Sequence, residues 1–406
     1  MPEELRDDLF RNILAAESIR TDFQPIVSLI RQQVVGIEAL SRGIDPETGA
    51  VIAPLDLFRA GERLNCNLEL DRLCRKTAVT TFSRLTAQRQ LLLFLNFNPG
   101  VLDEGVVGSR HLQDLFQRLH IHPSQIALEI VESKVKSRRA LLNFVRFYRE
   151  IGCMIVLDDF GEDQSNLERV ASLRPDIIKI SRNLVDGITY DYFKQSVVAA
   201  IISLAGKIGS LVLAEGVERF DDIMTCHEIG ADLMQGYFFS KPKPAEKTDA
   251  NDCCLTTMQE VAKEMQSRLA MNYHKNIQQQ EEMSAILTKV SNLLISEGTT
   301  GFDRVLHHAI SNCREVQCFY ILDNRGTQVS ETIFLSPPTP RNNLFDPAAK
   351  GAVHTLKDYY LTLVQSGMSR FCTEPYISLA SGNICRTMSF TFSGLDKKAY
   401  ILCVDF

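Results

Sequence analysis

The sequence predicts an α/β fold built on a parallel sheet, followed by a smaller second domain. Three observations predict it: apolar runs of strand length recur along the first 240 residues, segments with helical apolar spacing separate them, and the pattern changes after a long helical stretch. Strands that alternate with helices are typical of parallel sheets. Eight such units close into a barrel of about 250 residues, so we expect a TIM-like (β/α)8 barrel.

The expected barrel strands follow one another along the chain. They read FQPIVSL, VVGIEAL, LLLFLNF, IALEIVE, MIVLDDF, IIKIS, LVLAEGV and LMQGYFF. Between them, residues 138–150 and 196–207 carry apolar residues at helical spacing. Polar residues lie at or within two positions of the ends of these runs: Glu38, Asn96, Glu129, Asp158, Lys179, Glu215 and Gln235. Barrel enzymes keep their chemistry at the C-terminal mouth, so we expect these side chains to form one cluster there.

A helical linker is expected after the barrel. Residues 240–252 contain Pro, Lys and Asp with little to bury, whereas residues 255–295 contain neither Pro nor Gly and repeat apolar residues at helical spacing. At ~1.5 Å per residue this amphipathic helix would extend about 60 Å. The sequence SEGTTG ends it. We therefore expect a barrel domain over residues 1–250, a linking helix over 251–297 and a third region over 298–406.

The last hundred residues alternate like antiparallel strands. The runs are VQCFYILD, GTQVSETIFL, RFCTEPYISL, ICRTMSFTFS and AYILCVDF, with helical segments expected at 302–313 and 348–366. A five-stranded sheet with flanking helices resembles a PAS or Cache-type sensor domain, and a dimerisation module without a ligand is the alternative. Arg370, Tyr376, Arg386 and Asp405 either line a pocket for an unidentified small ligand or are ordinary surface and core residues.

Composition narrows the partners and the compartment. The 44 Lys and Arg against 50 Asp and Glu argue against a nucleic-acid polymer as partner, while a small anionic ligand remains open. Eleven cysteines without paired metal-type spacing favour reduced thiols. The longest apolar stretch, 197–205, is far shorter than the roughly 20 residues of a membrane helix, and the acidic start does not resemble a secretory signal. We expect a cytoplasmic protein without membrane insertion.

Oxygen ligands dominate the expected cluster at the barrel mouth. They come from Glu38, Asn96, Glu129, Asp158, Asp159 and Glu215. Oxygen-only sites suit Mg²⁺ or Mn²⁺, whereas zinc favours His or Cys. Crowded carboxylates repel unless a cation neutralises them, and two metals about 3.5 to 4 Å apart can hold both partners of an in-line phosphoryl displacement. Lys179 and Arg42 add positive charge for an anionic substrate.

Each of these acids has a simpler explanation when taken alone. A single acid after a strand is commonly a helix N-cap or a surface residue. Complementary polar groups at seven strand ends are hard to explain as caps. Lys179 inside IIKI needs a charged partner, which the acids provide.

An ordered series of motifs resembles the EAL domain family of cyclic di-GMP phosphodiesterases. The motifs are Gln24-Pro25-Ile26, Glu38-Ala39-Leu40-Ser41-Arg42, Asn96, Glu129-Ile130-Val131-Glu132, Asp158-Asp159-Phe160-Gly161, Lys179-Ile180, Glu215-Gly216-Val217-Glu218 and Gln235-Gly236-Tyr237. The match spans roughly residues 15–245. Barrel, long helix and C-terminal PAS-like domain together resemble the YkuI type within that family.

This resemblance implies a modified barrel whose first strand runs antiparallel to the others, and it implies roles for single residues. Glu38, Asn96, Glu129 and Asp158 would bind the first metal, and Asp158 would bridge to a second metal held by Asp159. Lys179 would orient the attacking water, and Glu215 would act as general base or hold that water through the metal. Gln24, Leu40, Arg42 and Gln235 would bind cyclic di-GMP, with Asp71 near the substrate. Glu132 and Glu218 would brace the metal site and its loop.

Three positions depart from the family pattern. Glu162-Asp163-Gln164 follows Gly161 in place of a small residue, Gly and an aromatic, Val131 replaces Thr, and Ser181 replaces a common Asp. The expected function is hydrolysis of cyclic di-GMP to linear pGpG by a homodimer. A receptor that binds the same dinucleotide without cleaving it is the alternative, and an unrelated metal-dependent barrel lyase is a third interpretation.

Overall fold

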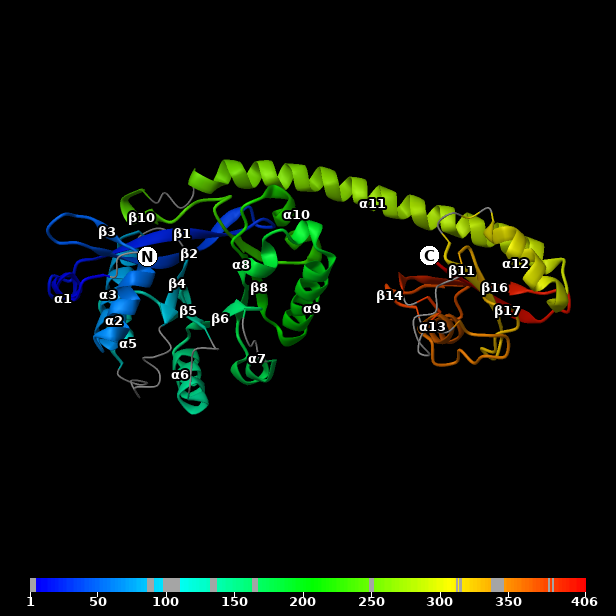
Figure 1. The fold of residues 1–406 in the computed structure, drawn as a ribbon, viewed down its shortest axis with the longest axis horizontal. Helices are drawn as coiled ribbons and strands as arrows, with labels where there is room; N and C mark the ends of the chain where they lie inside the picture. Colours follow the sequence, from blue (N-terminus) through cyan, green and yellow to red (C-terminus); the bar gives the residue numbers. More distant parts are fainter. Residues whose placement is uncertain are drawn as a thin grey trace. The chain divides into compact units, whose positions relative to one another are not determined.

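The chain forms two compact units, Met1–Arg268 and Leu269–Phe406 (Figure 1). The computed structural model describes residues 5–85, 91–97, 110–131, 137–162, 167–247, 252–311, 313, 316–336, 347–378, 380–381 and 383–406. Among the described helices, none has both the length and the apolar character that a membrane crossing requires.

The first unit is a closed barrel of eight strands. They are β1 (Ile19–Ser28), β2 (Gln33–Ile44), β4 (Leu92–Phe97), β5 (Ile126–Ile130), β6 (Met154–Phe160), β7 (Ile177–Ile180), β8 (Leu211–Glu215) and β9 (Leu233–Gln235). The order around the barrel is β1-β9-β8-β7-β6-β5-β4-β2, and pairing of β1 with β2 closes it. Strand β1 is antiparallel to both neighbours, whereas the other neighbours pair in parallel. The predicted fold class is confirmed, and each of the eight apolar runs contributes to one strand.

Helices surround this barrel. They are α1 (Asp7–Ala15), α2 (Pro54–Arg63), α3 (Asn67–Leu85), α5 (His111–Arg118), α6 (Arg138–Glu150), α7 (Leu167–Leu173), α8 (Arg182–Val185), α9 (Tyr192–Ile208) and α10 (Phe220–Ile229). Local sequence sets their ends: Ser137 accepts a hydrogen bond from the N–H of Ala140 at the start of α6, and Gly209 ends α9 in a left-handed conformation that suits glycine. Short strands β3 (Val51–Ile52) and β10 (Lys243–Pro244) pair with β2 and β1.

The inside of the barrel is layered. An apolar layer consists of Ile26, Phe94, Ala127, Val156, Ile177, Leu213 and Leu233, none more than 6% exposed. Gly36 occupies this layer on β2, because a Cβ there would lie 2.7 Å from the ring of Phe94. Side chains two positions apart on a strand face the same side, so the residue two positions nearer the mouth also faces inward. It is polar on every strand, which gives the polar layer: Gln24, Glu38, Asn96, Glu129, Asp158, Lys179, Glu215 and Gln235.

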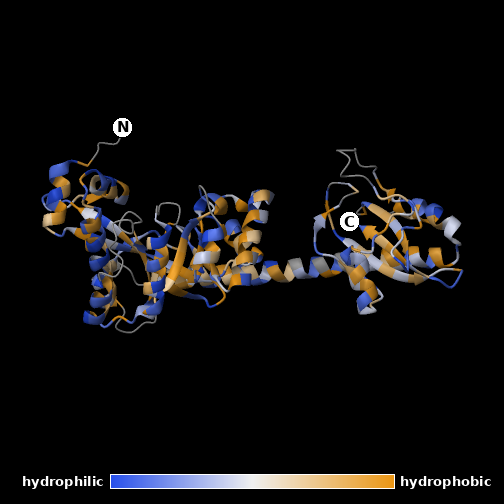
Figure 2. Cartoon of the chain, turned by 90° about the horizontal axis from the view of Figure 1, so that it is seen from below, coloured by the Kyte–Doolittle hydropathy of each residue, from blue (hydrophilic) through white to orange (hydrophobic). Residues whose placement is uncertain are grey.

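The second unit contains an antiparallel sheet of order β12-β11-β17-β16-β13. Its strands are β11 (Cys318–Asp323), β12 (Ile333–Phe334), β13 (Arg370–Cys372), β16 (Thr387–Ser393) and β17 (Ala399–Asp405), and β14 (Tyr376–Ile377) pairs separately with β15 (Ile384–Cys385). Helices α12 (Phe302–Ile310) and α13 (Asp358–Ser366) complete it. Figure 2 shows hydrophobic residues concentrated on the central strands of this sheet. The predicted α+β domain is confirmed.

Helix α11 (Asp252–Ile295) supplies apolar side chains to both units. Its N-terminal part packs Cys254, Met258, Val261 and Met265 into the core of the first unit. Its C-terminal part packs Met283, Leu287, Val290 and Leu294 into the core of the second. The predicted long helix is therefore present, and residues between these two groups, such as Met271 and Tyr273, are exposed.

Candidate active site

Lys179 is the centre of the polar layer. Its Nζ lies 2.8 Å from Glu129 Oε1, 3.1 Å from Asp158 Oδ1, and 3.7 Å from both Glu38 Oε2 and Glu215 Oε2. The side chain is 1% exposed. Burial lowers the pKa of an ammonium, but the surrounding carboxylates, Asp158 first, hold the pKa of Lys179 well above its usual value. Lys179 is thus a fixed positive charge.

Glu38 is held from both sides by amide groups. Asn96 Nδ2 donates to its Oε1 at 2.7 Å, and Gln235 Nε2 donates to its Oε2 at 2.6 Å. Gln235 Nε2 also lies 3.2 Å from Gln24 Oε1, and Gln24 Nε2 donates to the carbonyl oxygen of Ser240 at 3.1 Å. Burial raises the pKa of Glu38, but Lys179 and these hydrogen bonds outweigh it, so its pKa lies below the usual value. Glu38 is therefore a carboxylate whose two oxygens are both fixed in position.

Glu129 has the opposite electrostatic balance. It is fully buried, and its Oε2 has no hydrogen-bond partner among the described residues. Burial, with the nearby charge of Glu38, raises the pKa of Glu129 well above its usual value, despite the ion pair with Lys179. A buried carboxylate oxygen without a donor is costly, and a cation is one group that would satisfy it.

Three further acids converge beside this group. Oxygens of Asp158, Asp159 and Glu215 all lie within 4.8 Å of one another. Asp159 adopts a left-handed backbone conformation with φ 53°, and its N–H donates to Asp158 Oδ1 at 3.0 Å. Burial raises the pKa of Glu215 to about 7, with Lys179 opposing and the neighbouring acids adding to the shift. The predicted clustering of strand-end acids is present in the described part of the barrel.

The donor set fits divalent cations. Four carboxylates, from Glu38, Glu129, Asp158 and Glu215, lie within 4 Å of the Lys179 ammonium, and Asp159 clusters with the last two of them. Carboxylate and amide oxygens are the donors that Mg²⁺ and Mn²⁺ prefer. Burial and the neighbouring carboxylates raise the pKa values of Glu129 and Glu215, and a bound cation would oppose both shifts because it favours the ionised form of each acid.

The outer part of the mouth contains a second charged group. Arg42, predicted as a substrate ligand, pairs through its Nε with Asp22 Oδ2 at 3.3 Å. Leu40 lies directly across from Asp22 in the β1–β2 pairing. Arg20 also binds Asp22, with Nε 2.9 Å from Oδ1. Reasoning from the sequence missed Arg20 and Asp22, although counting back by two from Gln24 along β1 would have placed both on the inner face.

The remaining predicted residues lie away from the strand ends. Asp71 is on helix α3, where it forms a buried ion pair with Arg75, and the guanidinium of Arg75 lies 4.0 Å above the ring of Phe97. Glu218 Oε1 pairs with Arg182 at 2.8 Å. Glu132 is outside the described residues, as are Asp163 and Gln164 of the altered loop. Glu162, in the same loop, accepts a hydrogen bond from Asn183 on α8 at 2.8 Å.

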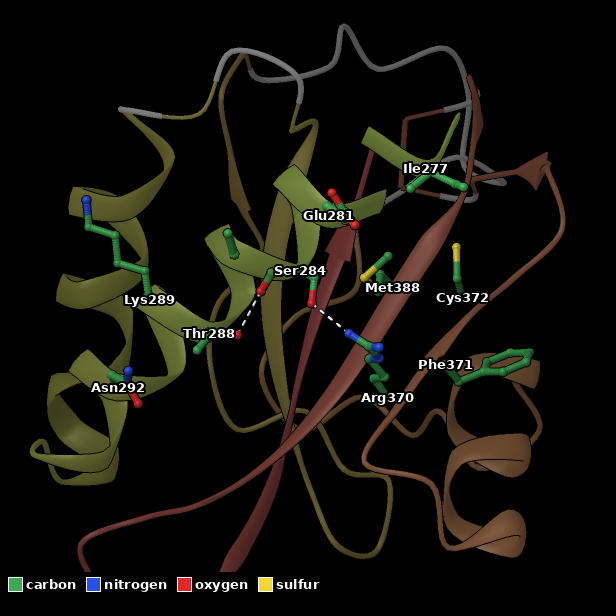
Figure 3. Close-up of a pocket in the computed structure, with 11 residues that line it drawn as sticks. Ile277, Glu281, Ser284, Thr288, Lys289, Asn292, Arg370, Phe371, Cys372 and Met388 are labelled. Carbon is green, nitrogen blue, oxygen red and sulfur yellow. Dashed lines mark hydrogen bonds between the residues drawn. The ribbon is translucent and has the colours of Figure 1, made fainter. Parts of the chain in front are cut away.

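The four candidates in the second unit have different surroundings. Arg370 lines a groove of about 960 Å³ between α11 and β13, where it donates to Ser284 at 2.8 Å (Figure 3). Asp405 accepts a hydrogen bond from Thr387 at 2.7 Å, and Tyr376 lies 2.5 Å from the same Thr387 hydroxyl. The backbone of Arg386 pairs with that of Phe406. Asp405 and Tyr376 thus belong to one internal network, separate from the groove.

Comparison with known proteins decides the family of the first unit. The EAL domain profile matches residues 4–242, more than half of the chain. The chain belongs to the EAL domain family. Within that family, it is 30% identical over 226 residues to the probable cyclic di-GMP phosphodiesterase PdeB of Escherichia coli (strain K12), a match that covers 55% of this chain and 42% of PdeB. The chain therefore spans less than half the length of PdeB.

One relative matches nearly the whole chain, and another matches the barrel region. The uncharacterized EAL-domain containing protein YkuI of Bacillus subtilis (strain 168) is 24% identical over 402 residues, covering 97% of this chain and 95% of YkuI. The structure of YkuI with c-di-GMP and calcium has a TM-score of 0.81 at 23% identity and covers 99% of both chains, which confirms the shared fold. Klebsiella pneumoniae BlrP1, in a manganese and cyclic di-GMP complex, has a TM-score of 0.51 at 27% identity over 56% of this chain and 57% of BlrP1.

Proposed function

We propose that this EAL protein hydrolyses cyclic di-GMP to linear pGpG. The convergence of five carboxylates, Asn96 and a buried lysine at the mouth of the barrel is the observation that carries the proposal. The relatives PdeB, named as a probable phosphodiesterase, and BlrP1, solved with cyclic di-GMP, support the substrate. A receptor that only binds would not need a fixed cation beside a group that titrates near neutral pH.

We assign two divalent cations per site, Mg²⁺ or Mn²⁺, to the acids of the polar layer and to Asp159, which follows Asp158 in the chain. The first would be held by Glu38, Asn96, Glu129 and Asp158, and the second by Asp158 and Asp159. Cations there would neutralise the carboxylates and stabilise negative charge on the phosphate oxygens. Asn96 and Gln235 orient Glu38 for this role, because each fixes one of its oxygens.

Lys179 and Glu215 are assigned to the chemical step. Glu215, whose pKa is raised to about 7, accepts a proton from the attacking water while the phosphorus–oxygen bond to the 3′ oxygen breaks, and the departing 3′ oxygen takes up a proton from solvent water. The products are a 5′-phosphate and a 3′-hydroxyl. Lys179 keeps its proton because its pKa is raised, so it orients the water and offsets charge on the phosphate.

Substrate contacts are assigned to the residues around this centre. Gln24, Leu40, Arg42 and Gln235 would contact the dinucleotide, with Asp71 nearby. Gln24 and Gln235 are also bonded to each other and, through Gln235, to Glu38, so they couple substrate position to a metal ligand. Glu218 would stabilise its loop through Arg182.

A homodimer is proposed on the basis of an apolar stripe along α9. Phe193, Val197, Ala200, Leu204 and Ile208 follow one another at helical spacing, whereas only Val198 and Ala205 of this helix are buried. Phe193 is 80% exposed and Val197 46%. A second copy packed antiparallel on the stripe would place Phe193 against Ile208 of the partner copy. Light scattering at micromolar concentration that shows only monomer would contradict the dimer.

Turnover by the full chain tests the proposal. Purified protein with Mg²⁺ or Mn²⁺ should convert cyclic di-GMP to pGpG, and Glu38→Ala should abolish the conversion. Binding of cyclic di-GMP without turnover under both metals would favour the receptor. The domain division at 1–250, 251–297 and 298–406, and an unidentified ligand of the last region, are part of the same proposal.

A further inference from the structure

The hairpin of β1 and β2 extends a ladder of side chains outward from the polar layer. In its antiparallel register Gln24 lies opposite Glu38, Asp22 opposite Leu40, and Arg20 opposite Arg42. Residues two apart on a strand share a face, so Arg20 and Arg42 face the same side as Glu38. Because β1 runs opposite to the other strands, its first residues lie at the mouth. Arg20 and Arg42 therefore form the outermost step of the ladder, the rim pair.

Asp22 holds the rim pair together. Two like charges directly across a sheet destabilise it unless an opposite charge lies between them. Asp22, 6% exposed, supplies that charge: its Oδ1 accepts from Arg20 Nε at 2.9 Å, and its Oδ2 lies 3.3 Å from Arg42 Nε. One carboxylate between two guanidinium groups leaves one net positive charge. The polar layer has the opposite excess, since four acids there lie within 4 Å of one lysine.

Unused donors remain on both arginines. A guanidinium carries five N–H groups. Arg20 uses Nε and Nη2 on Asp22, while Arg42 uses Nε on Asp22 and Nη1 on the carbonyl oxygen of Ser41. In the described part of the chain, no hydrogen bond engages Arg20 Nη1 or Arg42 Nη2. The side chain of Arg20 is 37% exposed and that of Arg42 17%, so both reach solvent.

We propose that Arg20 and Arg42, fixed by Asp22, bind the second phosphate of a two-phosphate ligand whose first phosphate lies at the polar layer. The inference rests on the proposed function and adds Arg20 to its binding site. Four residues of strand separate Gln24 from Arg20, about 13 Å at 3.3 Å per residue. A ligand whose single phosphate binds at the acids would not reach the rim pair. A cyclic dinucleotide has a second phosphate that extends toward Arg20 and Arg42. Two neighbouring guanidinium groups, each with N–H donors that make no other hydrogen bond in the described part of the chain, suit the oxygens of a phosphate.

Calorimetric binding of cyclic di-GMP and of GMP in the presence of Ca²⁺ tests this. Arg20→Gln should weaken cyclic di-GMP binding about five- to tenfold, the size expected for one partly exposed charge-assisted contact. GMP binding should change by less than about twofold. Arg63→Gln is the matched control, since the Arg63 side chain is 38% exposed and also pairs with an aspartate, Asp7, but lies on α2. Arg20→Lys keeps the positive charge but lacks the planar guanidinium. Its affinity for cyclic di-GMP should lie between the affinities of Arg20→Gln and the unaltered chain.

The outcomes separate this inference from the proposed function. Equal affinity of Arg20→Gln and the unaltered chain for cyclic di-GMP would overturn the rim pair and leave the phosphodiesterase intact. An equal loss for cyclic di-GMP and GMP would show that Arg20 acts through the structure of the site, which also overturns it. Failure of the unaltered chain to bind cyclic di-GMP would overturn both. Added salt should shrink the difference between Arg20→Gln and the unaltered chain, because the contact is partly exposed.

Discussion

Both units bury carboxylates against a sheet, but they balance them differently. In the barrel, four acids lie within 4 Å of one ammonium and a fifth, Asp159, lies beside two of them, so carboxylates outnumber the cation and Glu129 Oε2 has no hydrogen-bond partner among the described residues. In the second unit, Asp405 is 3% exposed and accepts a hydrogen bond from the neutral hydroxyl of Thr387. Burial raises its pKa to about 6. A cluster of unbalanced charges indicates a place for ions, whereas a single buried carboxyl bonded to a neutral hydroxyl indicates a structural network.

The largest expected effect is the loss of the single cation of the polar layer. Lys179→Met leaves buried acids unpaired, so it should abolish turnover and lower the free energy of unfolding of the barrel by about 3 to 5 kcal/mol in the absence of metal. Urea unfolding measures the change. Lys76→Met, which removes an exposed pair with Glu17, is the control and should cost less than about 1 kcal/mol. Equal losses of unfolding free energy in the two variants would mean that the buried ion pairs of Lys179 stabilise the barrel no more than an exposed ion pair does.

Glu215→Gln should separate chemistry from binding. The amide keeps the shape of the side chain but cannot accept the proton, so kcat should fall about 10²- to 10⁴-fold. The affinity for cyclic di-GMP should change by less than about threefold. Single-turnover kinetics and calorimetry measure the two quantities. A parallel loss of both would assign Glu215 to binding instead.

Metal should stabilise one unit only. Mn²⁺ at a hundred times its dissociation constant should raise the stability of the barrel by about 2.7 kcal/mol, because binding to the folded state shifts the unfolding equilibrium. The second unit should not respond. Hydrogen exchange with and without Mn²⁺ measures the stability of each unit separately. If protection increased in β16 and β17 as much as in the barrel strands, the prediction that metal stabilises only the barrel would be wrong.

Asp405→Asn should have the smallest effect, and one that depends on pH. The folded pKa of Asp405 is about 6 against 3.8 for the free group, so the folded state binds more protons between these values. Stability is therefore highest at low pH and is lost as pH rises from about 4 through 6. At pH 7 the variant should be more stable by about 2 kcal/mol, below the ceiling of about 3 kcal/mol for a shift of two pKa units. At pH 3, below both pKa values, the advantage should nearly vanish. A thermal-unfolding difference independent of pH would argue against a buried ionised carboxyl.

Much of the barrel was predictable because each strand repeats one local pattern. An apolar inner residue is followed two positions later by a polar one, as in Phe94 and Asn96 or Ile177 and Lys179, and both period and order are visible in the sequence. The pairing of Gln235 with Gln24 and Glu38 was not predictable, because it depends on which strands become neighbours when the barrel closes. The rim pair depends on the same closure.

The second unit was less predictable. A helix was expected from residue 348, but α13 begins at Asp358. Gly351 has φ 96°, and the backbone around it bonds to the loop after β11 through Gln328 to Ala352 and His354 to Gly326. These long-range bonds override the local apolar spacing. The five-stranded sheet was predicted correctly, although β12 has only two residues and β13 three.

The ring of Phe94, which fills the space beside Gly36, has a consequence for the proposed reaction. That ring and its six aliphatic neighbours fill the barrel interior below the polar layer, so no ligand can pass along the barrel axis to the N-terminal end of the strands. In the proposed hydrolysis, the linear product would have to leave through the same C-terminal mouth through which the substrate enters. Product and substrate would then compete for one site, so pGpG is expected to act as a competitive inhibitor of the proposed reaction.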